Sequence, residues 1–158
     1  MEISTIVQVL KKEGRIVLTE GNGNTIELVV PDQWNTLHDR QNGIFLIFEL
    51  FQIRSIALPF SEVSLDIVEL ATKPVIYHTP ANGALKNAPL INDKLKFALI
   101  KEGFWNQLLF NFGRPLIYQL AEGEGAVLNR TNEKFPLLDA GVKEMFLGPE
   151  GEVKILKG

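Results

Sequence analysis

The feature that most constrains this chain is an irregular alternation of short strand-like runs and amphipathic helical patterns along its 158 residues. Four apolar residues between Ile3 and Leu10 recur at helical spacing, and a β-branched run over 25–30 indicates a strand soon afterwards. Strict strand–helix–strand repetition is absent, so a purely parallel doubly wound sheet is not expected. The pattern predicts a single α/β domain of the α+β type over 1–158, with helices packed on a twisted mixed β-sheet.

Turn and capping signals divide the chain into the expected elements. Helices are expected over 3–13, 32–41, 50–58, 62–70 and 103–112. Strands are expected over 15–18, 25–30, 44–48, 75–79, 95–100 and 115–120, with loops over 80–89 and 122–132. The last two apolar runs, 141–147 and 152–156, flank a Gly-Pro-Glu-Gly turn and predict a closing hairpin.

Residue types exclude several classes of chemistry. The chain contains no cysteine, which excludes disulfides, thiolate metal sites and cysteine nucleophiles. Its two histidines, His38 and His78, do not have the spacing of metal ligands. No dinucleotide glycine fingerprint, Walker lysine motif or nucleophile elbow occurs, and no pair of carboxylates stands out as an acid–base couple. The residues themselves therefore assign no metal site and no catalytic residue.

The hydropathy pattern predicts neither a membrane segment nor an export signal. The longest apolar run, Ile44–Phe48, ends at Glu49 and falls far short of the roughly 20 residues of a membrane helix. No basic start precedes an apolar stretch with a small-residue cleavage site. We therefore expect a cytoplasmic protein with no membrane partner.

Charge is distributed unevenly along the chain. The formal net charge is −3, yet the segment 73–101 contains five lysines and one aspartate, which gives it +4 and leaves −7 elsewhere. A basic segment inside an acidic protein can form a phosphate- or RNA-binding surface. The alternative is a set of solvated lysines on exposed strand and loop positions.

Several short motifs follow one another in a distinctive order in the later two-thirds of the chain. A helix leads through Lys73-Pro74 into the strand 75–79, and an apolar-proline loop follows. The helix after the next strand ends in the step Phe112-Gly113-Arg114-Pro115, which opens another strand, and the chain closes with the strand 152–156. This order resembles the YrdC-like, or threonylcarbamoyl-adenylate synthase, family over roughly 44–158. The resemblance implies a YrdC-like fold with a concave, basic surface on a twisted mixed sheet.

Active members of that family combine threonine, bicarbonate and ATP into an adenylate that is used to modify tRNA, and three signatures carry the chemistry. Of the first, a Pro-Thr-Asp/Glu-Thr turn, only Thr19 and Glu20 remain, and His38-Asp39-Arg40 stands in place of a Lys-x-Arg motif. The segment 117–122 replaces a Ser-Thr-Ser-Ala-Asn sequence. Each missing charge-assisted contact is worth about 1.5–3 kcal/mol. The resemblance therefore implies a shortened, divergent member that has kept the fold and lost synthesis.

The predicted function is that of a catalytically degenerate YrdC-like domain that binds a nucleotide or double-stranded RNA weakly. No cofactor is expected, although the resemblance makes ATP the natural candidate ligand. The residues expected to contact nucleotide or RNA on the concave face are Arg40, Lys73, His78, Lys101 and Arg114.

Two other functions remain open at this point. One is an active threonylcarbamoyl-AMP synthase whose motifs are displaced along the chain. The other is a protein-interaction module without a ligand, including a homodimer. In that case an exposed Trp34 or Trp105 could anchor the partner, whereas core packing is the alternative role for both.

Overall fold

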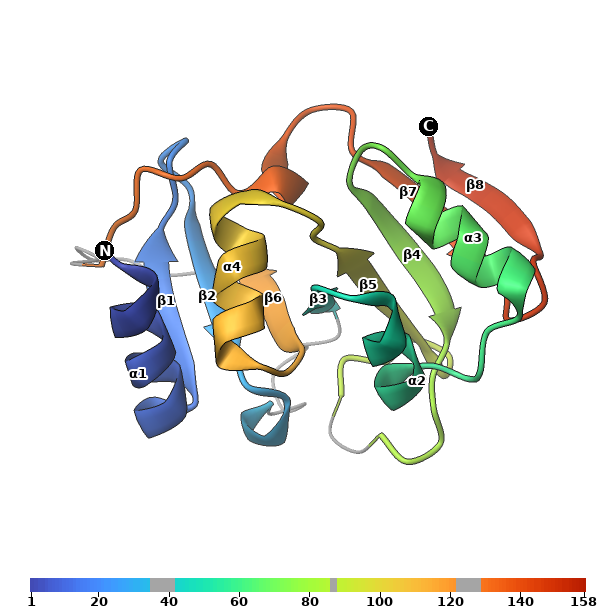
Figure 1. The fold of residues 1–158 in the computed structure, drawn as a ribbon, viewed down its shortest axis with the longest axis horizontal. Coiled ribbons are helices and arrows are strands. Elements are labelled where there is room, and N and C mark those ends of the chain that lie inside the picture. Colours follow the sequence, from blue (N-terminus) through green and yellow to red (C-terminus); the bar gives the residue numbers. More distant parts are fainter. Residues whose placement is uncertain (35–41, 86–87, 122–128) are drawn as a thin grey trace.

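One mixed sheet of eight strands runs through the part of the chain that the computed structural model describes, residues 1–34, 42–85, 88–121 and 129–158 (Figure 1). The strands are β1 (Arg15–Thr19), β2 (Thr25–Val29), β3 (Ile44–Ile47), β4 (Val75–Pro80), β5 (Lys94–Leu99), β6 (Leu116–Leu120), β7 (Lys143–Leu147) and β8 (Val153–Lys157). Their order in the sheet is β1-β2-β6-β3-β5-β4-β7-β8. The β3–β5 and β4–β7 pairs are parallel and the other pairs are antiparallel. The expected twisted mixed sheet and the closing hairpin are confirmed.

Helices cover the two ends of the sheet. The described α-helices are α1 (Ile3–Glu13), α2 (Ile53–Ile56), α3 (Glu62–Leu70) and α4 (Gly103–Phe112), and the described 3₁₀ helices are η1 (Pro31–Gln33), η3 (Leu50–Gln52) and η4 (Pro136–Leu138). Figure 1 shows α1 and α4 beside β1, β2 and β6, and α3 beside β4, β7 and β8. None of the described helices is both long enough and apolar enough to cross a lipid bilayer.

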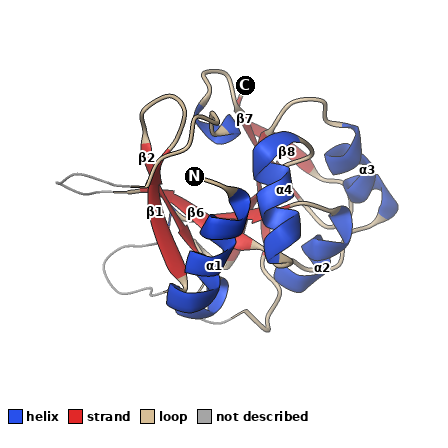
Figure 2. Ribbon diagram, turned by 60° about the vertical axis from the view of Figure 1, so that its left-hand side comes forward, coloured by secondary structure: helices blue, strands red, loops and turns tan. Residues whose placement is uncertain are grey.

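The sheet separates two hydrophobic cores. In β6, Leu116 and Tyr118 belong to the core under α1 and α4, which we call the first core, whereas Ile117 between them belongs to the second core under α2 and α3. This alternation arises because successive residues of a strand point to opposite faces. The two pairs of helices therefore pack on opposite faces of one strongly twisted sheet (Figure 2).

The signals that end or start helices act as the sequence predicts. Gly14 and Gly113 follow α1 and α4 in the left-handed conformation, with φ of 78° and 90°, and each donates its N–H to a carbonyl in the last turn. Ser61 precedes α3, and its hydroxyl oxygen accepts the N–H of Ser64 at 3.3 Å.

Two predicted helices differ from the structure. The helix expected over 32–41 begins as the 3₁₀ helix η1, whose N-cap is Val30 and not Asp32, because Pro31 starts the helical turn. Residues 35–41 lie outside the described residues. The helix expected over 50–58 is shorter, because η3 and α2 together end at Ile56 and the backbone is extended at Ala57.

Candidate functional site

The residues expected to be the remnant of the first signature, Thr19 and Glu20, lead into a turn organised around a buried carboxylate. Glu20 follows β1 and is only 2% exposed. Its carboxylate accepts the backbone N–H of Asn22 at 2.7 Å, of Asn24 at 3.0 Å and of Phe135 at 2.8 Å. Burial by itself would raise the pKa of Glu20, but these donors and the Asn24 amide outweigh it and lower the pKa below its ordinary value. Glu20 is therefore an ionised structural group.

The segment 132–135 lies directly against this turn. Gly21 donates its N–H to the carbonyl of Glu133 at 2.9 Å, and the Trp105 indole donates to the carbonyl of Lys134 at 2.8 Å. A Cβ atom at Gly21 would lie 2.5 Å from the carbonyl oxygen of Asn132, so this close approach requires glycine. Together with the Glu20 bond, these contacts place Phe135 in the first core.

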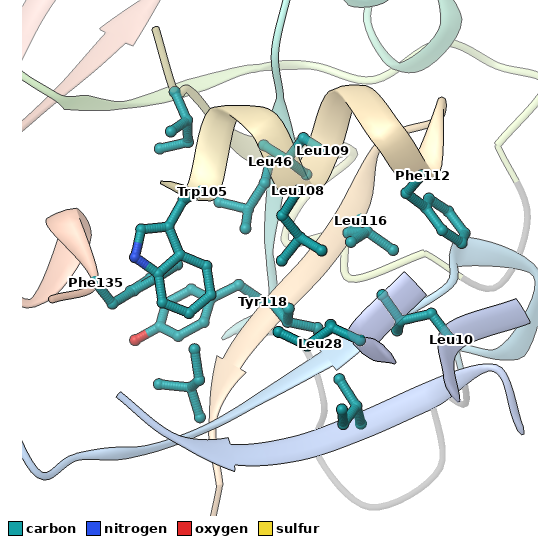
Figure 3. Close-up of a cluster of buried hydrophobic side chains, with 14 of the residues drawn as sticks. Leu10, Leu28, Leu46, Trp105, Leu108, Leu109, Phe112, Leu116, Tyr118 and Phe135 are labelled. Carbon is teal, nitrogen blue, oxygen red and sulfur yellow. The ribbon is translucent and has the colours of Figure 1, made fainter. Parts of the chain in front are cut away.

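Phe135 fills the space between the positions of the first and third signatures. Its side chain is completely buried, and its ring centroid lies 4.4 Å from that of Tyr118 and 5.0 Å from that of Trp105. Figure 3 shows the three aromatic side chains packed together under α4. Tyr118 stands within the stretch that replaces the serine-rich signature, and burial followed by the charge of Glu20 raises its pKa to about 12. The three aromatic side chains therefore fill this part of the first core.

A separate pocket opens where α3 and β5 end and α4 begins. It has a volume of about 350 Å³. Lys73, Lys101 and Lys134 line it together with three carboxylate side chains, those of Glu102, Glu133 and Asp139. The apolar part of the lining includes Val68, Val75, Tyr77, Leu99, Phe104 and Trp105. The pocket thus combines an apolar wall with charges of both signs.

The cationic groups of this pocket are not equivalent. Lys101 donates from its ammonium group to the carbonyls of Glu69 and Ala71, so its side chain caps the end of α3. Lys73 and Lys134 are exposed, as Lys101 is. The first turn of α4 adds positive potential, because Glu102 at its N-cap makes no side-chain capping bond and helix N-termini attract anions.

Tyr77 places a phenol in the wall of the same pocket. The side chain is 2% exposed and stacks on Phe97 with ring centroids 5.1 Å apart. Burial raises the pKa of Tyr77 to about 12, so the hydroxyl keeps its proton and can act as a hydrogen-bond donor at neutral pH. Neither Tyr77 nor Lys134 was predicted from the sequence as a site residue.

Five residues were predicted to share one concave face; of the four that the structure describes, Lys73 and Lys101 line the same pocket, whereas His78 and Arg114 do not. His78 lies on β4, where its Nε2 is 2.9 Å from Oε1 of Glu144. Arg114 lies beyond α4, donates to Asp32 at 3.3 Å and covers the Phe112 ring. Arg40 lies outside the described residues.

Acidic and histidine side chains do not gather into a metal centre in the described residues, where no group of three or more of them could hold an ion. The turn around Glu20 also offers no free base, because the carboxylate accepts the donors described above. The pocket lined by Lys73 is therefore suited to binding a ligand through charge and apolar contact.

Solved structures that share this fold include the following two. One is the crystal structure of full-length HypF in the phosphate- and nucleotide-bound form, with a TM-score of 0.67 and 13% identity over 98% of this chain and 28% of HypF. The other is E. coli YciO, with a TM-score of 0.65 and 12% identity over 98% of this chain and 87% of YciO. The chain thus spans little more than a quarter of HypF. No protein-family model and no curated protein matches the sequence. The likeness confirms the expected YrdC-like architecture at the level of the fold.

Proposed function

We propose that the chain is a YrdC-like domain that has kept the fold, lost adenylate synthesis and binds a nucleotide weakly in the pocket beside Lys73. The observation that carries the loss of synthesis is the burial of Phe135 between Glu20 and Tyr118. The positions of two signatures of the resembled family lie side by side there. The residues at these positions, Glu20 and Tyr118, both contact Phe135. A reacting triphosphate and threonine find no open, hydroxyl-lined surface at that place.

The pocket beside Lys73 supports the proposal of nucleotide binding. Its volume of about 350 Å³ falls within the range of small-molecule sites, which is roughly 300–1,000 Å³. Phosphate groups are attracted by Lys73, by Lys134 and by the N-terminus of α4, and a base can lie against Phe104 or Trp105. The nearby carboxylates of Glu102 and Glu133 oppose the phosphates, so the affinity is weak. HypF, which shares the fold over part of its length, was solved with phosphate and nucleotide bound.

Calorimetric titration with ATP at low salt tests this proposal. The expected dissociation constant is roughly millimolar, and Lys73→Gln is expected to weaken binding about tenfold, because a charge-assisted contact to phosphate is lost. Lys143→Gln is the matched control, since it removes the same charge from an exposed position on β7 that does not line the pocket. Adenosine should bind more weakly than ATP.

Two results would contradict nucleotide binding in this pocket. One is the absence of binding heat at low salt with a folded protein. The other is an equal affinity of the Lys73→Gln and Lys143→Gln variants, because the phosphates would then be bound elsewhere. A preference for a short RNA duplex over ATP would favour the other predicted ligand.

A further inference from the structure

Another pocket lies between η3, α2 and α3, and it shares no described lining residue with the pocket beside Lys73. Its volume is about 520 Å³, which falls within the range of small-molecule sites, roughly 300–1,000 Å³. Six of its seven described lining residues are apolar, among them Phe51, Ile53, Phe60 and Leu65. The pocket is therefore suited to an apolar group.

The floor of this pocket is fixed by the second core. Ile53 is 2% exposed, and Leu65 packs against the same core. The Phe60 ring lies 6.1 Å from the ring of Phe97 on β5, which holds it in place as well. Because these side chains are anchored by the core, the pocket keeps its shape without a ligand, and this lowers the entropic cost of binding.

Phe51 forms an exposed wall of the pocket, with 58% of its side chain accessible to solvent. The turn that carries it is held by the buried Gln52, whose side-chain oxygen accepts the N–H groups of Phe48 at 2.6 Å and of Glu49 at 3.1 Å. The Phe48 ring also packs edge-on against Phe51, with the ring centroids 6.3 Å apart. Phe51 is therefore held in a position that faces solvent, where its ring can cover the apolar part of a ligand.

Arg54 supplies the charge of the pocket among its described lining residues. Its guanidinium makes no ion pair or hydrogen bond with another described residue, whereas Arg15 and Arg114 each pair with a carboxylate. Glu49 and Asp66 are next to lining residues in the sequence, but neither lines the pocket. The described walls therefore present one unpaired cation and no acid, which favours a ligand with a negative charge.

We propose that this pocket binds a small amphiphilic carboxylate, such as a medium-chain fatty acid, with its hydrocarbon chain against Phe51 and Leu65 and its carboxylate on Arg54. A guanidinium binds a carboxylate through two parallel N–H···O bonds, which an ammonium head group cannot accept. The apolar walls add to the affinity, because each buried CH₂ group contributes up to about fourfold. The site is separate from the pocket beside Lys73 and does not depend on nucleotide binding there.

NMR titration of the ¹⁵N-labelled protein with sodium octanoate at low salt tests the proposal. The expected dissociation constant is roughly millimolar, and hexanoate should bind about two- to fourfold more weakly for each CH₂ group that it lacks. Octylammonium has a chain of the same length and the opposite charge, and it should bind at least about tenfold more weakly than octanoate. The protein has a net charge of −3, so unspecific attraction would favour octylammonium, and a preference for octanoate reports on the local cation.

Two matched pairs of variants separate this pocket from the rest of the molecule. Arg54→Gln should weaken octanoate binding about tenfold, whereas Arg130→Gln should leave it unchanged, because Arg130 is also exposed but does not line the pocket. Phe51→Ala should weaken binding about fivefold. Its control is Phe110→Ala, which removes a ring that is 62% exposed on α4 and lies outside the pocket. Thermal unfolding shows whether each variant is folded; if Phe51→Ala is not, the arginine pair decides the outcome.

Three results would overturn the proposal. The first is the absence of octanoate binding by the folded protein at low salt. The second is binding of octylammonium as tight as that of octanoate, which would show that the carboxylate is not recognised. The third is an equal affinity of Arg54→Gln and Arg130→Gln for octanoate, because the ligand would then be bound elsewhere on the molecule.

Discussion

Replacement of Glu20 by glutamine tests whether the remnant of the first signature has become a structural element. The two carboxylate oxygens of Glu20 accept backbone N–H groups from both sides, namely from the turn at Asn22 and Asn24 and from Phe135. Glutamine supplies one acceptor oxygen and one NH₂ group. Whichever way the amide is oriented, at least one backbone N–H then faces a donor, and all of these bonds lose the assistance of the negative charge.

The expected loss of stability follows from these contacts. A hydrogen bond to a charged group contributes about 1.5–3 kcal/mol, against about 0.5–1.5 kcal/mol for a neutral pair. The N–H of Phe135 lies in a completely buried residue and cannot turn to water, whereas Asn22 and Asn24 are exposed. We therefore expect Glu20→Gln to lower the free energy of unfolding by about 2 kcal/mol. For a chain of this size, that corresponds to a decrease of about 4–8 °C in Tm.

Urea unfolding of the wild type and of Glu20→Gln at several pH values measures this effect. The pKa of Glu20 is lower in the folded protein than in the unfolded chain, so its ionised form stabilises the fold above the unfolded value of about 4.3. The difference between the two proteins should be complete at pH 7. It should shrink as the pH falls below about 4.3 and through the folded pKa, because the wild-type carboxylate then becomes protonated.

Glu133→Gln is the matched control, because Glu133 is exposed and contacts the same turn through its backbone carbonyl. It should leave stability within about 0.5 kcal/mol of the wild type. Equal stability of Glu20→Gln and the wild type at pH 7 would refute the reasoning. A difference that does not change between pH 7 and low pH would show that the charge of Glu20 is not the cause.

Three further predictions concern the packing around the two candidate sites. Phe135→Ala should lower the free energy of unfolding in guanidinium by about 3–5 kcal/mol, because a completely buried ring is removed; a loss below about 1 kcal/mol would contradict its core position. Lys101→Met should cost about 1 kcal/mol and speed amide exchange in the last turn of α3, whose carbonyls lose a donor; unchanged exchange would show that the cap is dispensable. Tyr77 and Tyr118 are the two tyrosines of the chain, so ultraviolet titration of the folded protein should show ionisation centred on about pH 12, whereas a midpoint near 10 would show that neither phenol is buried.

The fold could be predicted well from local patterns. The helical spacing between Ile3 and Leu10 and the alternating apolar residues of the strands show which face of each element is buried. Gly14 and Gly113 show where two helices end. Buried faces and helix ends are local properties of the sequence. The helix expected over 32–41 was wrong at its start because Pro31 begins a 3₁₀ turn. The resemblance supplied what local patterns cannot, which is the arrangement of the strands in one YrdC-like sheet.

The site could be predicted only in part. Lys73 and Lys101 meet because one follows α3 and the other follows β5, and the order of elements implies that closeness. The role of Phe135 could not be predicted, because it depends on a bond to Glu20 from 115 positions away. His78 was expected in the same site, but it lies on β4, where its Nε2 is 2.9 Å from a carboxylate oxygen of Glu144.

The loss of synthesis is tested most directly by measuring pyrophosphate release from ATP in the presence of threonine and bicarbonate. We predict release at the background rate of a reaction without protein, because Phe135, Tyr118 and Glu20 occupy the place where two signatures of the resembled family would act. Pyrophosphate release well above that background, dependent on both threonine and bicarbonate, would contradict the account.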